Sequence, residues 1–293
     1  MAVPERESAF AKINLSLRVL GRRPDGYHEL QSLVVFAAIA DRIEAHHATA
    51  LTLELAGPFG VSLEGEADNL VLRAARRLRD LCGVSEGARI TLEKNLPVAS
   101  GIGGGSADAA AALRALMRLW HVSPDEAELV RLAASLGADV PVCLEPSPAM
   151  MSGVGEKIRR LTCLPDFSML LVNPRVELAT AEVFRALAAA PLGAAPANPE
   201  ISEFTSLDEM VAWLRSEPND LERPARSLLA VIGDVTGEIA ATPGCRLARM
   251  SGSGATCFGL FESLDDARSA AAALAAAHPD WWVAAAPAVS GSG

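Results

Sequence analysis

The sequence predicts an α+β fold, because stretches with the periodicity of strands and stretches with the periodicity of helices are interspersed along its 293 residues. Residues 10–20 alternate strictly between apolar and polar side chains, as a strand with one buried face does. Residues 106–120 repeat apolar side chains at helical spacing instead. A chain of this length predicts two domains, or one large one. Half of the residues are hydrophobic, so a sizeable core can form.

The N-terminal half gives its elements in a clear order. After the strand at 10–20, the Pro-Asp-Gly chemistry of residues 22–26 predicts a turn. An apolar run at 33–40 and two further strands within 42–55 follow. Residues 68–81 form a helix, with Asp68 or Asn69 as N-cap and Gly83 just past its end. A short strand is expected at 90–92.

Later elements are defined by glycines and prolines. A glycine-rich loop precedes a helix that begins at Ser106. Residues 123–126 (Ser-Pro-Asp-Glu) match a capping box with proline at the first helical position, and that helix stops at Gly137. Asp139 then leads into another strand. Proline and alanine become frequent in the second half, notably at 188–199, and we place the domain boundary so that the domains span 1–154 and 155–293.

Composition excludes several classes of protein. The net charge of −10 argues against a general nucleic-acid-binding surface, which requires clustered Lys and Arg. No run reaches the roughly 18 consecutive apolar residues that a membrane helix needs, and the mixed charges at the N-terminus do not resemble a signal peptide. The five cysteines contain no CxxC pair and are odd in number, which favours a reduced, cytoplasmic protein over a disulfide framework or a zinc site.

The strongest local signal for function is the segment 97–109, Pro-Val-Ala-Ser-Gly-Ile-Gly-Gly-Gly-Ser-Ala-Asp-Ala. Glycines let a ligand approach the backbone N–H groups closely, and the start of a helix adds unpaired donors and the positive end of its dipole. The segment is therefore a candidate phosphate-binding loop. The alternative is that the glycines only permit tight packing of a helix on a strand.

Two common phosphate loops do not fit this segment. A Walker A loop requires a lysine after its second glycine, and this loop has none. In the dinucleotide fingerprint, Ser106 would stand where the third glycine is needed. A different anion-binding architecture is implied.

Asp139 is a candidate base for proton transfer, and Lys12 is a candidate for the cation beside it. Asp139 lies between the glycine that ends a helix and an apolar segment, and Lys12 lies on the polar face of the strand at 10–20, together with Asn14. Phosphoryl transfer to an alcohol needs an oriented hydroxyl, an acceptor for its proton and positive charge on the transferred group. On local sequence alone, an aspartate such as Asp139 is more often a capping or turn residue, and a lysine such as Lys12 is more often a solvated strand lysine. A second glycine cluster at 250–259 is weak by itself, but could supply a second wall for the same site.

Five segments in order along the chain resemble motifs of the GHMP kinases, in the branch whose acceptor is a cytidine diphosphate-linked methylerythritol. They are residues 11–17, 24–28, 97–109, 137–142 and 251–255, with smaller matches at 68–70, 153–156, 173–174 and 219–222. The resemblance implies a two-domain α+β GHMP kinase fold with the active site in the inter-domain cleft. It further implies that ATP phosphorylates the 2-hydroxyl of the acceptor, in non-mevalonate isoprenoid biosynthesis, with Mg²⁺ as a second cofactor.

The resemblance also assigns residues. Asp139 would accept the proton of the acceptor hydroxyl, and Lys12 would hold that carboxylate ionised and stabilise developing charge. The residues expected to bind ATP are Asn69, Lys94, Pro97, Val98, Ala99, Ser100, Gly101, Ile102, Gly103, Gly104, Gly105, Ser106 and Ala107. Those expected to bind the cytidine diphosphate end are Asn14, Tyr27, His28, Thr180 and Phe184. No residue is assigned as a metal ligand. Ala107 and Ser100 depart from the motif of many relatives, which leaves Ser106 as the hydroxyl expected at the phosphates.

Tyr27 and His28 support this assignment by their chemistry. Tyr27 is the only tyrosine in the chain, and it stands beside His28 after a tight turn. An aromatic face and an adjacent imidazole suit a cytosine ring. The rivals are a GHMP kinase for a mevalonate-like or amino-alcohol acceptor, which has no nucleobase to hold, and a non-catalytic nucleotide- or sugar-binding relative. The expected partners are small molecules, without nucleic acid or membrane, in a monomer or weak homodimer.

Overall fold

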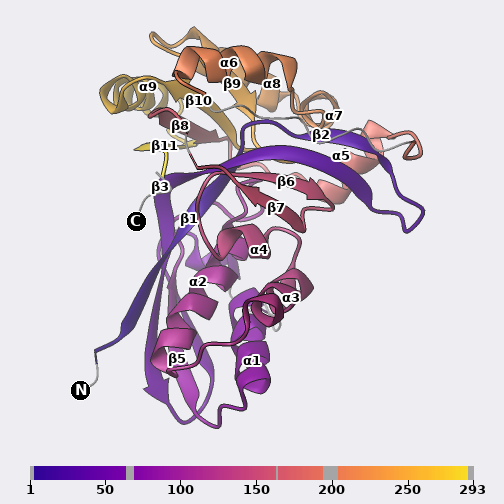
Figure 1. Ribbon diagram of the computed structural model, residues 1–293. Coiled ribbons are helices and arrows are strands. Elements are labelled where there is room, and N and C mark those ends of the chain that lie inside the picture. Colours follow the sequence, from indigo (N-terminus) through magenta and orange to yellow (C-terminus); the bar gives the residue numbers. More distant parts are fainter. Residues whose placement is uncertain (1–2, 64–68, 163, 194–203, 290–293) are drawn as a thin grey trace. The chain divides into compact units, whose positions relative to one another are not determined.

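The structure is a computed structural model that describes residues 3–63, 69–162, 164–193 and 204–289. The chain divides into two compact units that are interleaved along the sequence (Figure 1). Unit 1 comprises Met1–Ala11, Ala40–Val98 and Gly103–Glu145, and unit 2 comprises Lys12–Ile39, Ala99–Ile102 and Pro146–Gly293. The domain division predicted between residues 154 and 155 stays a prediction.

Unit 1 combines strands with a layer of helices. The second half of β3 pairs antiparallel with β5, and β5 pairs parallel with β4. Helix α2 packs against β5, α1 and α4, and ten of its 16 residues are buried. The elements with residues in this unit are β1 (Glu5–Asn14), β3 (His28–Ala48), β4 (Thr52–Ala56), the 3-10 helix η1 (Gly60–Leu63), α1 (Leu70–Cys82), β5 (Gly87–Glu93), α2 (Gly104–Leu119), α3 (Glu126–Leu136) and α4 (Val140–Cys143).

Unit 2 contains a four-stranded antiparallel sheet in the order β11-β8-β10-β9, with α8 and α9 packed on it. Its apolar core includes Leu170 and Val172 of β8 and Ile232, Val235 and Ile239 of α8. In the same unit, the first half of β3 pairs antiparallel with β2 and β6. The elements are β2 (Arg18–Arg22), β6 (Ala149–Gly153), β7 (Lys157–Arg160), β8 (Ser168–Asn173), α5 (Thr180–Leu187), α6 (Leu207–Ser216), α7 (Glu222–Leu228), α8 (Val231–Ala241), β9 (Leu247–Met250), β10 (Cys257–Phe261), α9 (Leu264–Ala277) and β11 (Trp282–Pro287).

Helix α1 confirms the helix predicted at 68–81. The side chain of Asn69 accepts the N–H of Val71, and Gly83 ends the helix with a φ of 63°. Its buried face consists of Val71, Ala74, Ala75 and Leu78. The strand predicted at 90–92 is β5, and the helix predicted to stop at Gly137 does so. These elements rest on local signals that the fold does not override.

The predicted strand at 10–20 is wrong in one respect, because it is two strands. β1 ends at Asn14 and β2 begins at Arg18. Between them the backbone turns to other partners: the N–H of Leu15 donates to the carbonyl of Leu33, and that of Leu17 to the carbonyl of Pro218. The polar face, whose environment the alternation alone left open, is buried, with Lys12 only 3% exposed. A polar face that is enclosed must find its partners inside the protein.

Three further boundaries differ from prediction. Asp125, not Ser123, caps α3, because its side chain accepts the N–H of Ala127. Helix α2 begins at Gly104, two residues before Ser106, since the chain already has helical geometry there. The segment after Asp139 is the short helix α4 rather than a strand, with Pro141 in its first turn. Of the loop predicted at 188–199, residues 194–199 lie outside the described residues, as does Cys163.

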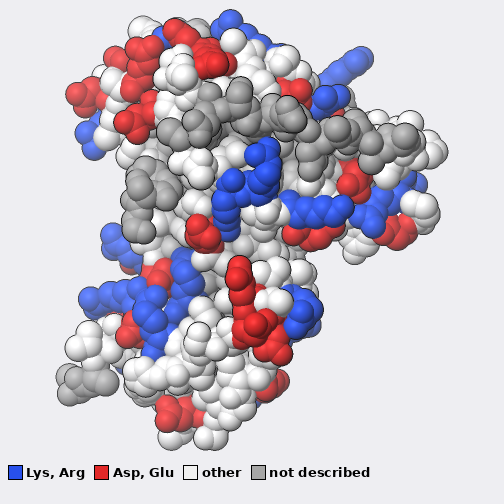
Figure 2. Space-filling model, in the orientation of Figure 1, with Lys and Arg blue, Asp and Glu red and all other residues white. Residues whose placement is uncertain are grey.

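Within the described ranges, no helix is long and apolar enough to cross a membrane. On the face shown in Figure 2, acidic and basic side chains are interspersed, without a single continuous basic field. Among the described cysteines, Cys82, Cys245 and Cys257 are in the thiol form. The reduced state of the whole chain stays a prediction.

Candidate active site

The start of α2 has the form of an anion-binding site. Gly103 is the N-cap of this 16-residue helix and, because glycine has no side chain, it makes no side-chain capping hydrogen bond. The first N–H groups of the helix therefore receive no side-chain acceptor from the cap, and the helix dipole adds positive potential at the same point. This arrangement suits the phosphates of a nucleotide.

The earlier part of the loop is held by the second glycine cluster, within unit 2. The hydroxyl of Ser251 donates to the carbonyl of Gly101 at 3.1 Å, and the N–H of Thr256 donates to the carbonyl of Ser100 at 3.1 Å. Gly101 has a φ of 75°, and a Cβ there would lie 2.6 Å from the carbonyl oxygen of Gly254. Only glycine allows this approach of the two loops.

The same loops enclose the end of β1. The N–H of Lys12 donates to the carbonyl of Ile102 at 2.9 Å, and the N–H of Asn14 donates to the hydroxyl of Ser251 at 3.1 Å. The side-chain amide of Asn14 donates to Ser32 Oγ at 2.7 Å. Its carbonyl oxygen is buried and has no hydrogen-bond partner among the described residues. An unsatisfied buried acceptor of this kind fits a site completed by a ligand.

An aromatic and hydroxyl cluster lies elsewhere in unit 2. The rings of His28 and Phe184 stack, with centroids 4.7 Å apart and planes inclined by 29°. Thr180, one turn before Phe184 on α5, shares a hydrogen bond of 2.8 Å with the hydroxyl of Ser253. Burial, followed by the positive charge of Arg22, lowers the pKa of His28. Thr180 is thereby hydrogen-bonded to the second glycine cluster, and Phe184 of the same helix stacks on His28.

Tyr27 directly precedes His28 of this cluster in the sequence. Its backbone N–H donates to the carboxylate of Asp25 at 3.1 Å, which closes the predicted Pro-Asp-Gly turn. Its side chain is 65% exposed. Packing against a neighbouring strand therefore does not account for the ring, whereas a ligand could.

Lys94 and Asn69, both predicted at the adenosine, have protein partners in unit 1. Asn69 is buried and caps α1. The ammonium of Lys94 forms ion pairs with Asp41 and, at 2.7 Å, with Asp108. All three of these side chains are at most 3% exposed. Sequence reasoning missed Asp41 and Asp108; the only available signal was the rarity of lysine, which occurs three times in the chain.

The turn at Asp139 lies close to the start of α2 within unit 1. A Cβ added at Gly137 would come within 3.9 Å of the hydroxyl oxygen of Ser106. Asp139 precedes α4, which packs against α2 and α3. Lys12 belongs to unit 2 and Asp139 to unit 1, so the predicted pairing of these two side chains stays a prediction.

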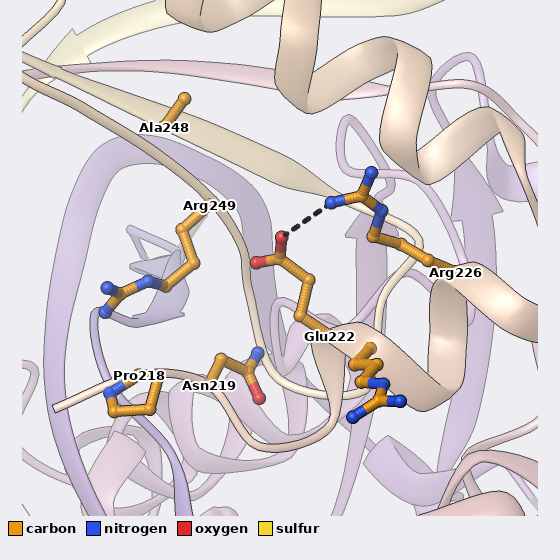
Figure 3. A pocket seen from close by; sticks show the side chains of 7 residues that line it. Pro218, Asn219, Glu222, Arg226, Ala248 and Arg249 are labelled. Carbon is orange, nitrogen blue, oxygen red and sulfur yellow. Dashed lines mark ion pairs between the residues drawn. The ribbon is translucent and has the colours of Figure 1, made fainter. Parts of the chain in front are cut away.

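A surface pocket behind the second glycine cluster contains residues that the sequence analysis noted only as a minor motif (Figure 3). Glu222 lies between Arg226 and Arg249 in this view, and its carboxylate accepts the N–H of Met250 at 3.0 Å. Arg249 is buried and donates to the carbonyl of Leu15 at 2.8 Å. The pocket is lined by Pro218, Asn219, Glu222, Arg223, Arg226, Ala248 and Arg249.

The comparisons with known proteins agree with one another. Residues 69–145 match the family model of the GHMP kinases N terminal domain, and residues 201–280 that of the GHMP kinases C terminal. The 4-diphosphocytidyl-2-C-methyl-D-erythritol kinase of Parvibaculum lavamentivorans is 60% identical over 283 residues, which cover 97% of this chain and 98% of that protein.

Solved structures extend the likeness. A crystal structure of 4-(cytidine 5'-diphospho)-2C-methyl-D-erythritol kinase superimposes with a TM-score of 0.76 at 37% identity, covering 97% of this chain and 98% of the other. The homoserine kinase of Cytophaga hutchinsonii has a TM-score of 0.71 at 18% identity, covering 99% and 98%, and shows the fold alone. The chain is therefore a GHMP kinase and belongs to the family of 4-diphosphocytidyl-2-C-methyl-D-erythritol kinases.

Proposed function

We propose that the chain transfers the γ-phosphoryl group of ATP to the 2-hydroxyl of 4-diphosphocytidyl-2-C-methyl-D-erythritol and releases ADP. The step belongs to non-mevalonate isoprenoid biosynthesis. The observation that carries the proposal is the 60% identity, over nearly the whole chain, to a relative of that name. The geometry supports both halves of the reaction: a helix start suited to phosphates, and an aromatic cluster suited to a nucleobase.

ATP binding is assigned to the loop 97–107. The backbone at the start of α2 would receive the phosphates, because its first N–H groups are not capped by a side chain. The hydroxyl of Ser106 lies in the first turn of this helix, beside Gly137, and would add a donor to a phosphate oxygen. In this proposal, the Ser251–Gly254 loop serves as the wall that fixes the earlier glycines.

The acceptor is assigned to the aromatic cluster of unit 2. The exposed ring of Tyr27 offers a face for the cytosine. The imidazole of His28, whose pKa is lowered by burial, can in its neutral form donate from one ring nitrogen and accept at the other. The unsatisfied carbonyl oxygen of Asn14 would accept a hydrogen bond from the acceptor. A mevalonate-like or amino-alcohol acceptor would leave the exposed tyrosine without a function.

Proton transfer is assigned to Asp139, which would take the proton of the 2-hydroxyl as that oxygen attacks phosphorus. Lys12 would keep the carboxylate ionised and stabilise negative charge as it develops on the transferred group. The step balances: the new P–O bond forms at the acceptor oxygen, the bond to the leaving ADP oxygen breaks, and the proton goes to Asp139.

Mg²⁺ is proposed as the counterion of the phosphates. Among the residues that the structure describes, no group of three or more His, Cys, Asp or Glu side chains could enclose a metal ion. In kinases Mg²⁺ commonly keeps several waters and is held by one or two carboxylates together with substrate phosphates. We assign it no protein ligand. The cytoplasmic location and the monomeric or weakly dimeric state stay predictions.

One assay tests the function. ADP release from ATP is measured with the cytidylyl acceptor, with mevalonate and with homoserine; turnover should require the first. Asp139→Asn keeps the shape of the side chain but removes the proton acceptor, so kcat should fall by roughly 10²-fold or more. Asp234→Asn, at an exposed position of α8, is the matched control. Near-normal turnover by a folded Asp139→Asn enzyme would exclude Asp139 as the base.

A further inference from the structure

A buried ion cluster lies directly beneath the start of α2. Lys94 follows β5, Asp41 lies near the middle of β3, and Asp108 is the fifth residue of α2. The ammonium of Lys94 donates to one carboxylate oxygen of Asp41 and, at 2.7 Å, to one of Asp108. The ammonium is thereby paired inside the protein, whereas the other carboxyl oxygen of Asp108 is buried without a hydrogen-bond partner among the described residues. The cluster therefore ties a strand, a loop and a helix together at one point.

Asp41 also holds the segment that enters the phosphate loop. Its second carboxylate oxygen accepts the backbone N–H groups of Asn95 and Leu96, the latter at 2.8 Å. Residue 97 begins the loop. The backbone of Lys94 is fixed as well, since its N–H donates to the carbonyl of Ala56 at 2.8 Å and its carbonyl accepts the N–H of Phe59 at 3.1 Å. The path of the chain into the loop thus depends on Asp41.

The cluster also contacts the helix start itself. A Cβ added at Gly104, the first residue of α2, would lie 3.1 Å from Lys94 Nζ and 3.9 Å from the carboxylate of Asp41. A side chain at position 104 would therefore point inward, toward the ammonium of Lys94. Lys94 is 2% exposed in this position, which gives it no surface to offer to an adenosine ring.

We propose that Asp41, Lys94 and Asp108 are positioning residues, which hold the entry and the first turn of the phosphate loop in the geometry that receives the ATP phosphates. The inference rests on the proposed function, because it takes the loop as the phosphate site. In this proposal Lys94 does not contact adenosine directly, but affects ATP binding through the backbone of the loop. The binding of ATP and ADP should depend on the cluster, whereas the binding of adenosine, which has no phosphate, should not.

The test uses the full chain and compares affinities for ATP, ADP and adenosine by calorimetry or ligand-observed NMR. In Asp41→Asn, the amide can keep accepting from Asn95 and Leu96, but its NH₂ group faces the ammonium of Lys94. Lys94→Met removes the cation and keeps an unbranched chain. Both variants should lower the affinity for ATP and for ADP by roughly tenfold or more, and should leave the affinity for adenosine within about twofold of the wild-type value. Asp80→Asn, at a position of α1 that is 74% exposed, is the matched control.

Because removal of a buried ion partner can prevent folding, a milder variant keeps the test decisive. Gly104→Ala places one methyl group against Lys94 Nζ at a helical position, where alanine itself is favoured. This variant should lower the affinity for ATP several-fold without changing the affinity for adenosine. Gly237→Ala, at a helical position of α8 with nothing within 4 Å of the added Cβ, is its control.

The outcomes separate the possibilities. Equal losses for ATP and adenosine in Lys94→Met would place Lys94 at the nucleoside and overturn the proposal. Unchanged ATP affinity in the folded variants, including Gly104→Ala, would make the cluster purely structural and overturn it as well. A wild-type protein that binds ATP but releases no ADP with the cytidylyl acceptor would refute the proposed function instead, and the affinity comparison would still stand.

Discussion

The side-chain amide of Asn219 donates a hydrogen bond of 2.8 Å to the backbone carbonyl of Gly252. The same nitrogen donates to the carbonyl of Met250 at 2.9 Å. Gly252 has a φ of 55°, and a Cβ there would lie 2.8 Å from the carbonyl oxygen of Gly101 in the first glycine loop. Asn219 therefore fixes the second glycine cluster at the point where it meets the first.

Asn219→Ala should destabilise the protein, because two buried carbonyls lose their shared donor. The expected loss in the free energy of unfolding is about 1–3 kcal/mol, measured by urea denaturation. Asn219→Asp keeps the size and the acceptor for the N–H of Leu221, but places oxygen against the two carbonyls, so it should cost at least as much. If both variants unfolded at the wild-type urea concentration, the amide would not hold this loop.

Tyr27→Ala should weaken binding of the cytidylyl acceptor while leaving stability nearly unchanged. Stacking of an aromatic side chain on a base contributes roughly 1–3 kcal/mol, which corresponds to about 5- to 150-fold in affinity. The ring is 65% exposed, so its removal takes away little packing. KM for both substrates and the melting temperature are measured together. A lower melting temperature with unchanged KM for the acceptor would contradict the stacking role.

Gly105→Val should obstruct ATP binding with less disturbance of the protein's own packing than Gly104→Val. A Cβ at position 105 has nothing within 4 Å and extends into open space at the helix start, whereas one at 104 points at Lys94. We expect ATP affinity to fall by roughly tenfold or more in Gly105→Val, with the melting temperature close to that of the matched helical control Gly237→Val. Wild-type ATP affinity in calorimetry would show that the space beside Gly105 is not where the phosphates bind.

Asp108 should make stability depend on pH. Burial raises the pKa of its carboxyl from 3.8 to about 8, despite the opposing charge of Lys94. Between these values the folded state holds a proton that the unfolded state has lost, so this group's contribution to stability falls as pH rises. Relative to Asp108→Asn, which cannot titrate, the wild type should lose stability between about pH 5 and about pH 8. Urea denaturation of both proteins at these pH values checks the sign, and a constant difference would contradict it.

The sequence by itself determined the local elements and the family. Helix α1 with Asn69 as its cap, the end of α3 at Gly137 and the loop before α2 all follow from residues within a few positions of one another. Such signals survive because a cap or a helical stripe is formed by neighbours along the chain. Five ordered motifs were sufficient to identify a GHMP kinase, which the relatives confirm.

Only the tertiary structure decided which distant residues meet. Asp41 and Lys94 are 53 positions apart, and no periodicity of either segment names its partner. The alternation of β1 left open whether its polar face is solvated or lines a site, and only the contacts of its backbone with residues 102 and 251 show that it is enclosed. Asp139 leads into α4 rather than a strand because packing against α2 and α3 overrides the preference of a short apolar segment. A periodic pattern says which face of an element is buried, but the partner that covers it is chosen by packing across the whole fold.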